Sequence, residues 1–160
     1  TFEYPVIVKP ANLGSSVGIG IAKDRSELGH RIDDAFRYSK RILIEHAITN
    51  LREINCSVLG DELEAIPSEC EEPLHTGDML DYADKYGNHA KGASEGMASV
   101  SRVLPAKLDP ELRDRIRNLA VRAFGVLGCN GVARMDFMID GDTGEVYFNE
   151  INTIPGQHDA

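Results

Sequence analysis

Four polar side chains near the C-terminal end of the sequence have the types and the spacing of a metal site. Arg134 and Asp136 lie two residues apart in one predicted strand, and Glu150 and Asn152 lie two apart in the next. Side chains alternate along a strand, so each pair shares one face. A turn centred on Asp142 places Arg134 opposite Glu150 and brings all four groups onto one face of a hairpin.

The oxygen donors of this hairpin indicate a magnesium site. An Asp, a Glu and an Asn are hard ligands that suit Mg²⁺ held together with substrate phosphates. Arg134 would bind an anion there, and the turn at residues 153–156 would present backbone amides to an oxyanion. The alternative is a solvated outer face of an edge hairpin with one cross-strand ion pair.

A second group of candidates lies near the N-terminal end. Lys9 ends a short apolar strand, where a lysine without a partner is rare. The glycine- and serine-rich loop at residues 14–18, which contains Ser15 and Ser16, lets backbone N–H groups and hydroxyls approach phosphates. It is not a Walker motif, because an isoleucine follows where that motif has a lysine. An ordinary flexible turn is the alternative.

Further polar residues stand at strand ends and in a long irregular stretch. Glu45 ends one apolar strand and Glu53 begins another. Such carboxylates accept hydrogen bonds from an amino group or from ribose hydroxyls, or are simply surface charges. Lys85 and Tyr86 lie within residues 67–100, which lack periodicity and therefore form either a functional lid or an exposed loop.

The periodicity of the sequence predicts the elements that position these groups. Apolar runs bounded by turn residues indicate strands, and an N-cap followed by apolar residues three and four apart indicates a helix. One helix should begin at the N-cap Ser26 and reach Phe36, and a longer one should run from the N-cap Asp109 to a stop at Gly128. The predicted strands span residues 5–9, 19–22, 41–45, 53–59, 63–66, 131–139 and 145–151.

Composition limits the classes of partner. The chain has 160 residues and a net charge of −9, from 17 basic and 26 acidic residues, so we expect neither nucleic acid nor an anionic membrane as a partner. No apolar run reaches the roughly 18 residues of a membrane span. The three cysteines lie far apart in the sequence without a C-x-x-C pair, which predicts a reducing, cytoplasmic location. The chain begins on the lead-in to a strand and ends after a Pro-Gly turn, so we expect a piece of a longer polypeptide.

Several motifs together resemble the D-alanine–D-alanine ligases of the ATP-grasp superfamily, over essentially the whole chain. They are PVIVKPANLGSSVGIG, RILIEHAI, REINCSVLG, DYADKY, LGCNGVARMDFMID and VYFNEINTIPG. The resemblance implies an α+β ATP-grasp fold, in which two α+β subdomains with antiparallel sheets grip the nucleotide between them. Residues 1–46 would be part of the small subdomain and residues 47–160 a truncated large one, without the family's N-terminal domain.

The resemblance also implies an activity. An ATP-dependent ligase of this family joins two D-alanines through an acyl phosphate for peptidoglycan precursors, using ATP and two Mg²⁺ ions, with Mn²⁺ as an alternative. The open alternatives are a D-Ala–D-lactate or D-Ala–D-serine ligase, another ATP-grasp carboxylate–amine ligase, and a non-catalytic nucleotide-binding module. We expect the chain alone to be inactive, and a homodimer is an open alternative for the full-length protein.

The matching motifs assign roles to residues of this sequence. The nucleotide would be held by Lys9 and Lys85 at the phosphates, Ser15 and Ser16 in the loop over the γ-phosphate, Glu45 and Glu53 at the adenosine, and Ala47 and Ile48 beside the adenine. Asp136, Glu150 and Asn152 would bind the metal ions, and Arg134 with the backbone N–H of Gly156 would form the oxyanion site. The Lys-Tyr pair ending at Tyr86 favours D-alanine as the acceptor.

Overall fold

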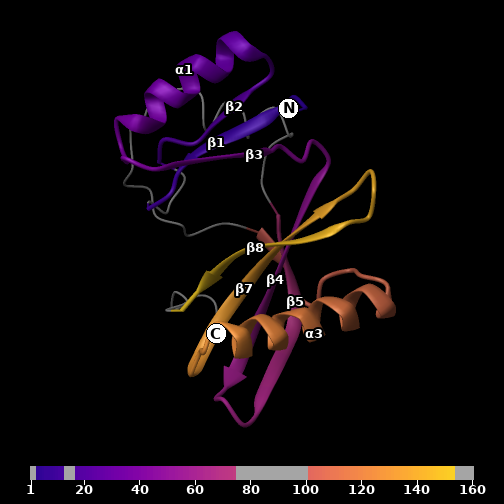
Figure 1. Ribbon diagram of the computed structural model, residues 1–160. Helices are drawn as coiled ribbons and strands as arrows, with labels where there is room; N and C mark the ends of the chain where they lie inside the picture. Colours follow the sequence, from indigo (N-terminus) through magenta and orange to yellow (C-terminus); the bar gives the residue numbers. More distant parts are fainter. Residues whose placement is uncertain (1–2, 13–16, 75–100, 154–160) are drawn as a thin grey trace. The chain divides into compact units, whose positions relative to one another are not determined.

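The computed structural model describes residues 3–12, 17–74 and 101–153 (Figure 1). These residues divide into two units, of which the first contains 3–12 and 17–49 and the second contains 50–74 and 101–153. In the described part of each unit, one helix packs on an antiparallel sheet. The α+β class predicted from the sequence is therefore confirmed. No helix within the described ranges is long and apolar enough to cross a membrane.

The first unit is a three-stranded sheet with a helix on one face. The strands are ordered β2-β1-β3, and both neighbours run antiparallel to β1. Val6, Val8 and Ala22 are fully buried on the helix side, and Ala35 of the helix is fully buried against them. The elements are β1 (Val6–Pro10), β2 (Gly20–Ala22), α1 (Arg25–Phe36) and β3 (Ile42–His46).

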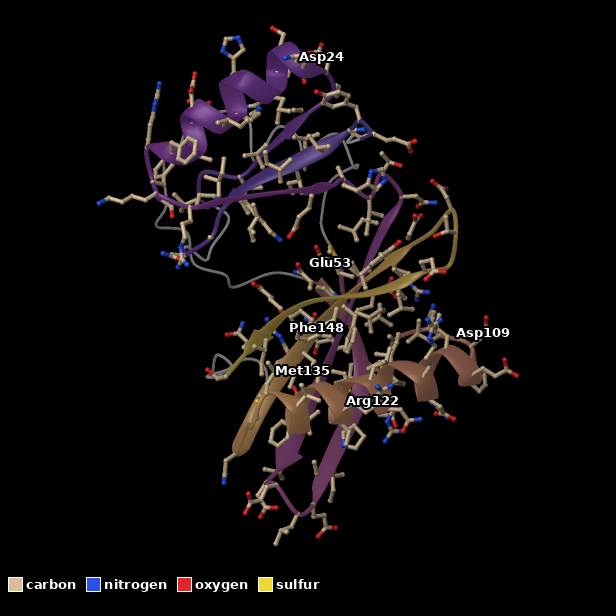
Figure 2. The ribbon with its side chains drawn as sticks, in the orientation of Figure 1. Asp24, Glu53, Asp109, Arg122, Met135 and Phe148 are labelled. Carbon is tan, nitrogen blue, oxygen red and sulfur yellow. The ribbon has the colours of Figure 1, made fainter. Side chains whose placement is uncertain are left out.

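Helix α1 begins at a different cap from the predicted one. The carboxylate of Asp24 accepts hydrogen bonds from the backbone N–H groups of Ser26 and Glu27, at 2.8 and 2.9 Å. The prediction of Ser26 as N-cap was therefore wrong by two residues. Asp24 is extended and lies where its oxygen reaches the first free N–H groups of the helix, which is the geometry of an N-cap (Figure 2).

The second unit is a five-stranded antiparallel sheet, with one face covered by a helix (Figure 1). The strand order is β6-β5-β4-β7-β8. Phe124, Ile116, Ile54, Met135 and Phe137 are among the fully or almost fully buried side chains between the sheet and the helix. The elements are β4 (Leu51–Gly60), β5 (Ala65–Leu74), β6 (Ser101–Val103), α3 (Pro110–Val126), β7 (Gly131–Asp140) and β8 (Val146–Asn152).

Helix α3 confirms its prediction. Asp109 is the N-cap and Pro110 occupies the first turn, where its missing N–H costs nothing (Figure 2). The Asp109 side chain makes no capping hydrogen bond. At the other end Gly128 has a φ of 65°, and the Cys129 N–H bonds back to the carbonyl of Phe124. A left-handed glycine with such a return bond is a common helix stop.

Strand β5 corrects the prediction that regular structure ends at Pro67. It continues to Leu74, and its register against β4 shifts between Cys56 and Val58. At the shift, the Ser57 N–H donates to the Ser68 hydroxyl instead of to a ladder carbonyl. The shift breaks the two-residue alternation that would reveal a strand. Strand β6, which was not predicted, pairs with residues 72–74 of β5.

An arginine ties the beginning of β4 to the end of β5. The guanidinium of Arg52 donates to both carboxylate oxygens of Glu72, at 2.6 and 2.7 Å, and to the carbonyl of Lys107 at 2.6 Å. The hydrogen bonds to Glu72 raise the pKa of Arg52. This bidentate pair fixes both strands and the segment that leads into α3.

Candidate functional site

The hairpin of β7 and β8 carries the predicted metal residues on one face, with a pairing that differs from the expected one. Asp136 lies opposite Glu150, and Arg134 lies opposite Asn152. The expected pairing of Arg134 with Glu150 was therefore wrong by two residues. The prediction that the four groups share a face is confirmed, because residues opposite one another in an antiparallel pair point the same way.

An extra residue in β8 produces this common face. Close to the turn, Phe137 lies opposite Phe148, and a ladder continued in that register would place Glu150 opposite the buried Met135. The register shifts there, so that Asn149 has no partner in β7. Such a bulge moves every later side chain to the other face. It turns Glu150 and Asn152 away from the core.

Arg134 and Asp136 form the central ion pair of this face. The Nε and Nη2 atoms of Arg134 donate to the two carboxylate oxygens of Asp136, at 2.7 and 3.0 Å. The two side chains are only 18% and 14% exposed. A bidentate, largely shielded pair of this kind is stronger than an exposed ion pair. It holds a guanidinium beside the carboxylates, where an anion bound to a metal would lie.

The other face of the hairpin anchors it to the core. Met135, Phe137 and Ile139 alternate with the site residues and are buried against α3. Phe148 meets Phe137 edge to face, with ring centroids 5.8 Å apart (Figure 2). Arg134 and Asp136 are therefore each flanked by buried core side chains, which hold this part of the hairpin in place.

Strand β4 adds neighbours that sequence reasoning missed. Asn55 lies opposite Asp136 on β7, and Ser57 lies opposite Arg134. Both alternate with the buried Ile54, Cys56 and Val58, so the face on which they lie follows from the two-residue period of a strand. Their position beside β7 could not be predicted, because β4 and β7 are far apart in the chain. Glu53, which was predicted, lies opposite Met138 on this same face.

The donor set of this face fits magnesium better than a dedicated metal cage. Among the described residues, no three His, Cys, Asp or Glu side chains are placed to hold a metal ion. The hairpin instead offers the carboxylates of Asp136 and Glu150 and the amide oxygen of Asn152. Two carboxylates with one amide leave positions for water and phosphate oxygens, which is how proteins bind Mg²⁺ with a nucleotide.

Two predicted residues of the first unit, Lys9 and Glu45, lie on the face of its sheet that is opposite α1. Lys9 on β1 and Glu45 on β3 form an ion pair with an Nζ–Oε2 distance of 2.6 Å. Glu45 is thus the partner that the position of Lys9 required. Ala47 is buried and donates its N–H to the carbonyl of Pro5, and Ile48 is the next residue after it. Glu45 and Ala47 therefore flank the end of β3.

The remaining predicted site residues lie outside the described ranges. They are Ser15, Ser16, Lys85, Tyr86 and Gly156. Within the described residues, the structure brings together Arg134, Asp136, Glu150 and Asn152 in one unit, and Lys9 with Glu45 in the other.

Comparison with known proteins connects these features to one family. The family model described as D-ala D-ala ligase C-terminus matches residues 1–160. The D-alanine–D-alanine ligase of Caldicellulosiruptor bescii is 47% identical over 155 residues, which is 97% of this chain and 40% of that protein. The ligase of the same name from Acetivibrio thermocellus is 43% identical over 97% of the chain and 38% of its own length. The chain thus spans about two fifths of these relatives.

Solved structures agree with the sequence relatives. The VanG D-Ala:D-Ser ligase from Enterococcus faecalis matches with a TM-score of 0.77 and 32% identity, over 98% of this chain and 42% of its own. The D-alanine–D-alanine ligase from Coxiella burnetii matches with a TM-score of 0.72 and 29% identity, over 94% of this chain and 36% of its own. The fold is the ATP-grasp α+β fold of these ligases, and the chain belongs to the family of D-alanine–D-alanine ligase C-terminal domains.

Proposed function

We propose that this chain is the ATP- and Mg²⁺-binding part of a ligase that joins two D-alanines. The observation that carries the proposal is the hairpin face of β7 and β8. It places two carboxylates and an amide beside a shielded arginine, in a chain that is 47% identical to a D-alanine–D-alanine ligase. This set suits a reaction in which phosphate and a developing oxyanion must be held together.

In the proposed reaction, ATP phosphorylates the carboxylate of one D-alanine. The amine of a second D-alanine attacks the acyl phosphate, and ADP and phosphate are released with the dipeptide. The dipeptide serves peptidoglycan synthesis in the cytoplasm, where ATP is available. Both steps are displacements at charged centres, so the protein contributes positioning and charge neutralisation more than acid–base chemistry.

In this proposal, the metal ions are bound by the oxygen-bearing side chains of the hairpin of β7 and β8. Asp136, Glu150 and Asn152 would bind two Mg²⁺ ions, or Mn²⁺ in their place, and these ions would supply positive charge to the phosphate oxygens. Arg134 lies two residues from Asp136 on the same face and donates to its carboxylate, so its guanidinium would be available to an oxyanion bound at this face. Together with the backbone N–H of Gly156, it stabilises the oxyanion of the tetrahedral intermediate.

The nucleotide roles rest on motif and position. Lys9 and Lys85 contact the phosphates, and Ser15 and Ser16 belong to the loop over the γ-phosphate. Glu45 and Glu53 accept hydrogen bonds from the adenosine, and Ala47 and Ile48 flank the adenine. Lys9 already holds Glu45 at 2.6 Å, so phosphate binding by Lys9 exchanges one anionic partner for another.

The choice of acceptor has a second candidate. The structural relative from Enterococcus faecalis is a D-Ala:D-Ser ligase, which favours D-serine as the alternative acceptor. Tyr86 favours D-alanine, and the relatives from Caldicellulosiruptor bescii and Acetivibrio thermocellus carry the D-alanine–D-alanine name. A D-lactate acceptor or another carboxylate–amine pair ranks lower. A module that binds nucleotide without catalysis has no need for both the acidic donors and Arg134.

The test uses a chimera, because the chain spans about 40% of its relatives. This chain replaces the matched region of the Caldicellulosiruptor bescii ligase, and ADP release from MgATP is measured with D-alanine, with D-serine and with neither. We expect ADP release that depends on D-alanine and disappears in the chimera with Asp136→Asn. ADP release that is indifferent to both amino acids, from a folded chimera, would contradict the proposal.

A further inference from the structure

Two cysteines that are 14 positions apart in the sequence are direct neighbours in the sheet of the second unit. Cys56 on β4 lies opposite Cys70 on β5, and both are free thiols that are 1% exposed. Directly opposed residues of antiparallel strands have Cα atoms about 4.5 or 5.5 Å apart. Both separations fall within the range that a disulfide spans. Their separation in the sequence did not reveal this pairing in the sheet.

The two thiols affect one another in opposite directions. The interaction with Cys70, together with burial, raises the pKa of the Cys56 thiol, and the interaction with Cys56 lowers the pKa of Cys70. The positive charge of Arg117 on α3 acts in the lowering direction on both. The Nε atom of Arg117 is buried and has no hydrogen-bond partner among the described residues. The Nη1 atom of Arg117 lies 3.5 Å from a carboxylate oxygen of Glu69, whose charge acts in the raising direction on Cys70.

We propose that Cys56 and Cys70 are a reversible dithiol–disulfide pair that hydrogen peroxide oxidises. The sulfur of Cys70 attacks one peroxide oxygen and the O–O bond breaks, which gives a sulfenic acid at Cys70 and one water. The sulfur of Cys56 then attacks that of Cys70, and the S–O bond breaks as a second water leaves with the Cys56 proton. Two thiols and one peroxide thereby become one disulfide and two waters.

The burial of the pair selects the oxidant. With both residues 1% exposed, large disulfides cannot reach the sulfurs without unfolding, whereas peroxide needs only a local opening. Strand β6 pairs with residues 72–74, and the carbonyl of Cys70 accepts a hydrogen bond from the Ala106 N–H beyond the end of that pairing. A local opening that breaks this hydrogen bond would therefore expose the strand that carries Cys70.

The bridge would lie directly behind the candidate site. Cys56 points into the core between Asn55 and Ser57, which point to the opposite face and lie beside Asp136 and Arg134. A disulfide at this position would fix the separation of β4 and β5 behind the metal residues. The inference itself rests on the thiol pair alone and stands whether or not the proposed ligase function is correct.

The test is a thiol map of this chain after treatment with hydrogen peroxide. The treated protein is unfolded in an alkylating reagent, digested and analysed by mass spectrometry. We expect that Cys129 remains alkylatable, that Cys56 and Cys70 are recovered as one cross-linked peptide pair lighter by two hydrogens, and that a reductant restores all three thiols. A Cys129→Ala variant should form the same bridge.

Two outcomes would overturn the proposal. One is alkylation of all three cysteines after peroxide treatment of the native chain. The other is bridging that involves Cys129 as often as the proposed pair. Peroxide treatment of the chain in denaturant is the control, because the unfolded chain lacks the strand pairing and should lose the preference for the Cys56–Cys70 bridge.

Discussion

Arg134 and a bound metal ion would compete for the carboxylate of Asp136, and the first prediction follows from this competition. Replacing Arg134 with alanine should tighten the binding of a divalent ion to this chain in the absence of nucleotide. The reason is that Arg134 donates to both oxygens of Asp136, at 2.7 and 3.0 Å, and adds a positive charge beside any cation bound there. When nucleotide is present, Arg134 would also attract its phosphates, but this measurement is made without nucleotide.

The size of the effect follows from the bonds that the metal must weaken. A hydrogen bond to a charged group contributes about 1.5–3 kcal/mol. The side chains of Arg134 and Asp136 are 18% and 14% exposed, so water would replace part of the hydrogen bonding that a bound metal ion removes. We therefore expect a gain of about 1–2 kcal/mol, which is roughly a 5- to 30-fold lower dissociation constant.

The assay is a titration with Mn²⁺, in which the free ion is measured by electron paramagnetic resonance. Arg122→Ala is the matched control, because it removes the same charge from an exposed position of α3 (Figure 2). Adding Asp136→Asn to Arg134→Ala should abolish the gain. If Arg134→Ala binds Mn²⁺ no more tightly than Arg122→Ala does, while both remain folded, then Asp136 is not the metal ligand that we assign.

Three further predictions concern stability. Phe124→Ala should cost about 3–5 kcal/mol in urea unfolding because Phe124 is fully buried, whereas Val126→Ala, at an 87% exposed position, should change stability by less than about 0.5 kcal/mol; equal losses would contradict the packing of α3. Asp24→Ala should lower stability by about 0.5–2 kcal/mol through loss of its two capping bonds, and Asp109→Ala, which loses no such bond, should cost less in the same thermal unfolding assay. The hydrogen bonds from the Glu64 and Leu63 N–H groups lower the pKa of Asp61. The stabilisation of the folded chain by the ionised Asp61 carboxylate should therefore be complete above about pH 4 and disappear as the pH falls through the folded-state pKa. An NMR titration that finds this pKa at or above 3.8 would refute the assignment.

Local patterns predicted most of the elements and the composition of the site. Helix α3 was recognisable because its N-terminal proline, apolar stripe and terminal glycine are all encoded within adjacent residues. The shared face of Arg134 with Asp136, and of Glu150 with Asn152, follows from the two-residue period of a strand alone. Such signals depend only on near neighbours in the chain.

Features that depend on distant partners could not be predicted. Asn149, which has no partner in β7, changes the register of β8, and the residue type at that position does not indicate a bulge. The pairing of Cys56 with Cys70 depends on the register shift between Cys56 and Val58, which the residue types likewise do not indicate. The position of Asn55 beside Asp136 could not be predicted, because the contact between β4 and β7 joins residues about 80 positions apart.

The central claim is that the β7–β8 face holds a metal ion together with nucleotide phosphates. The most direct test is the binding of Mn²⁺ with a non-hydrolysable ATP analogue to this chain, measured for Glu150→Gln and for the matched control Glu145→Gln, which changes an exposed glutamate just before β8. We predict that Glu150→Gln weakens binding of the complex at least about tenfold and that Glu145→Gln leaves it unchanged. Equal affinity of the two variants and the unaltered chain would contradict the assignment of this face.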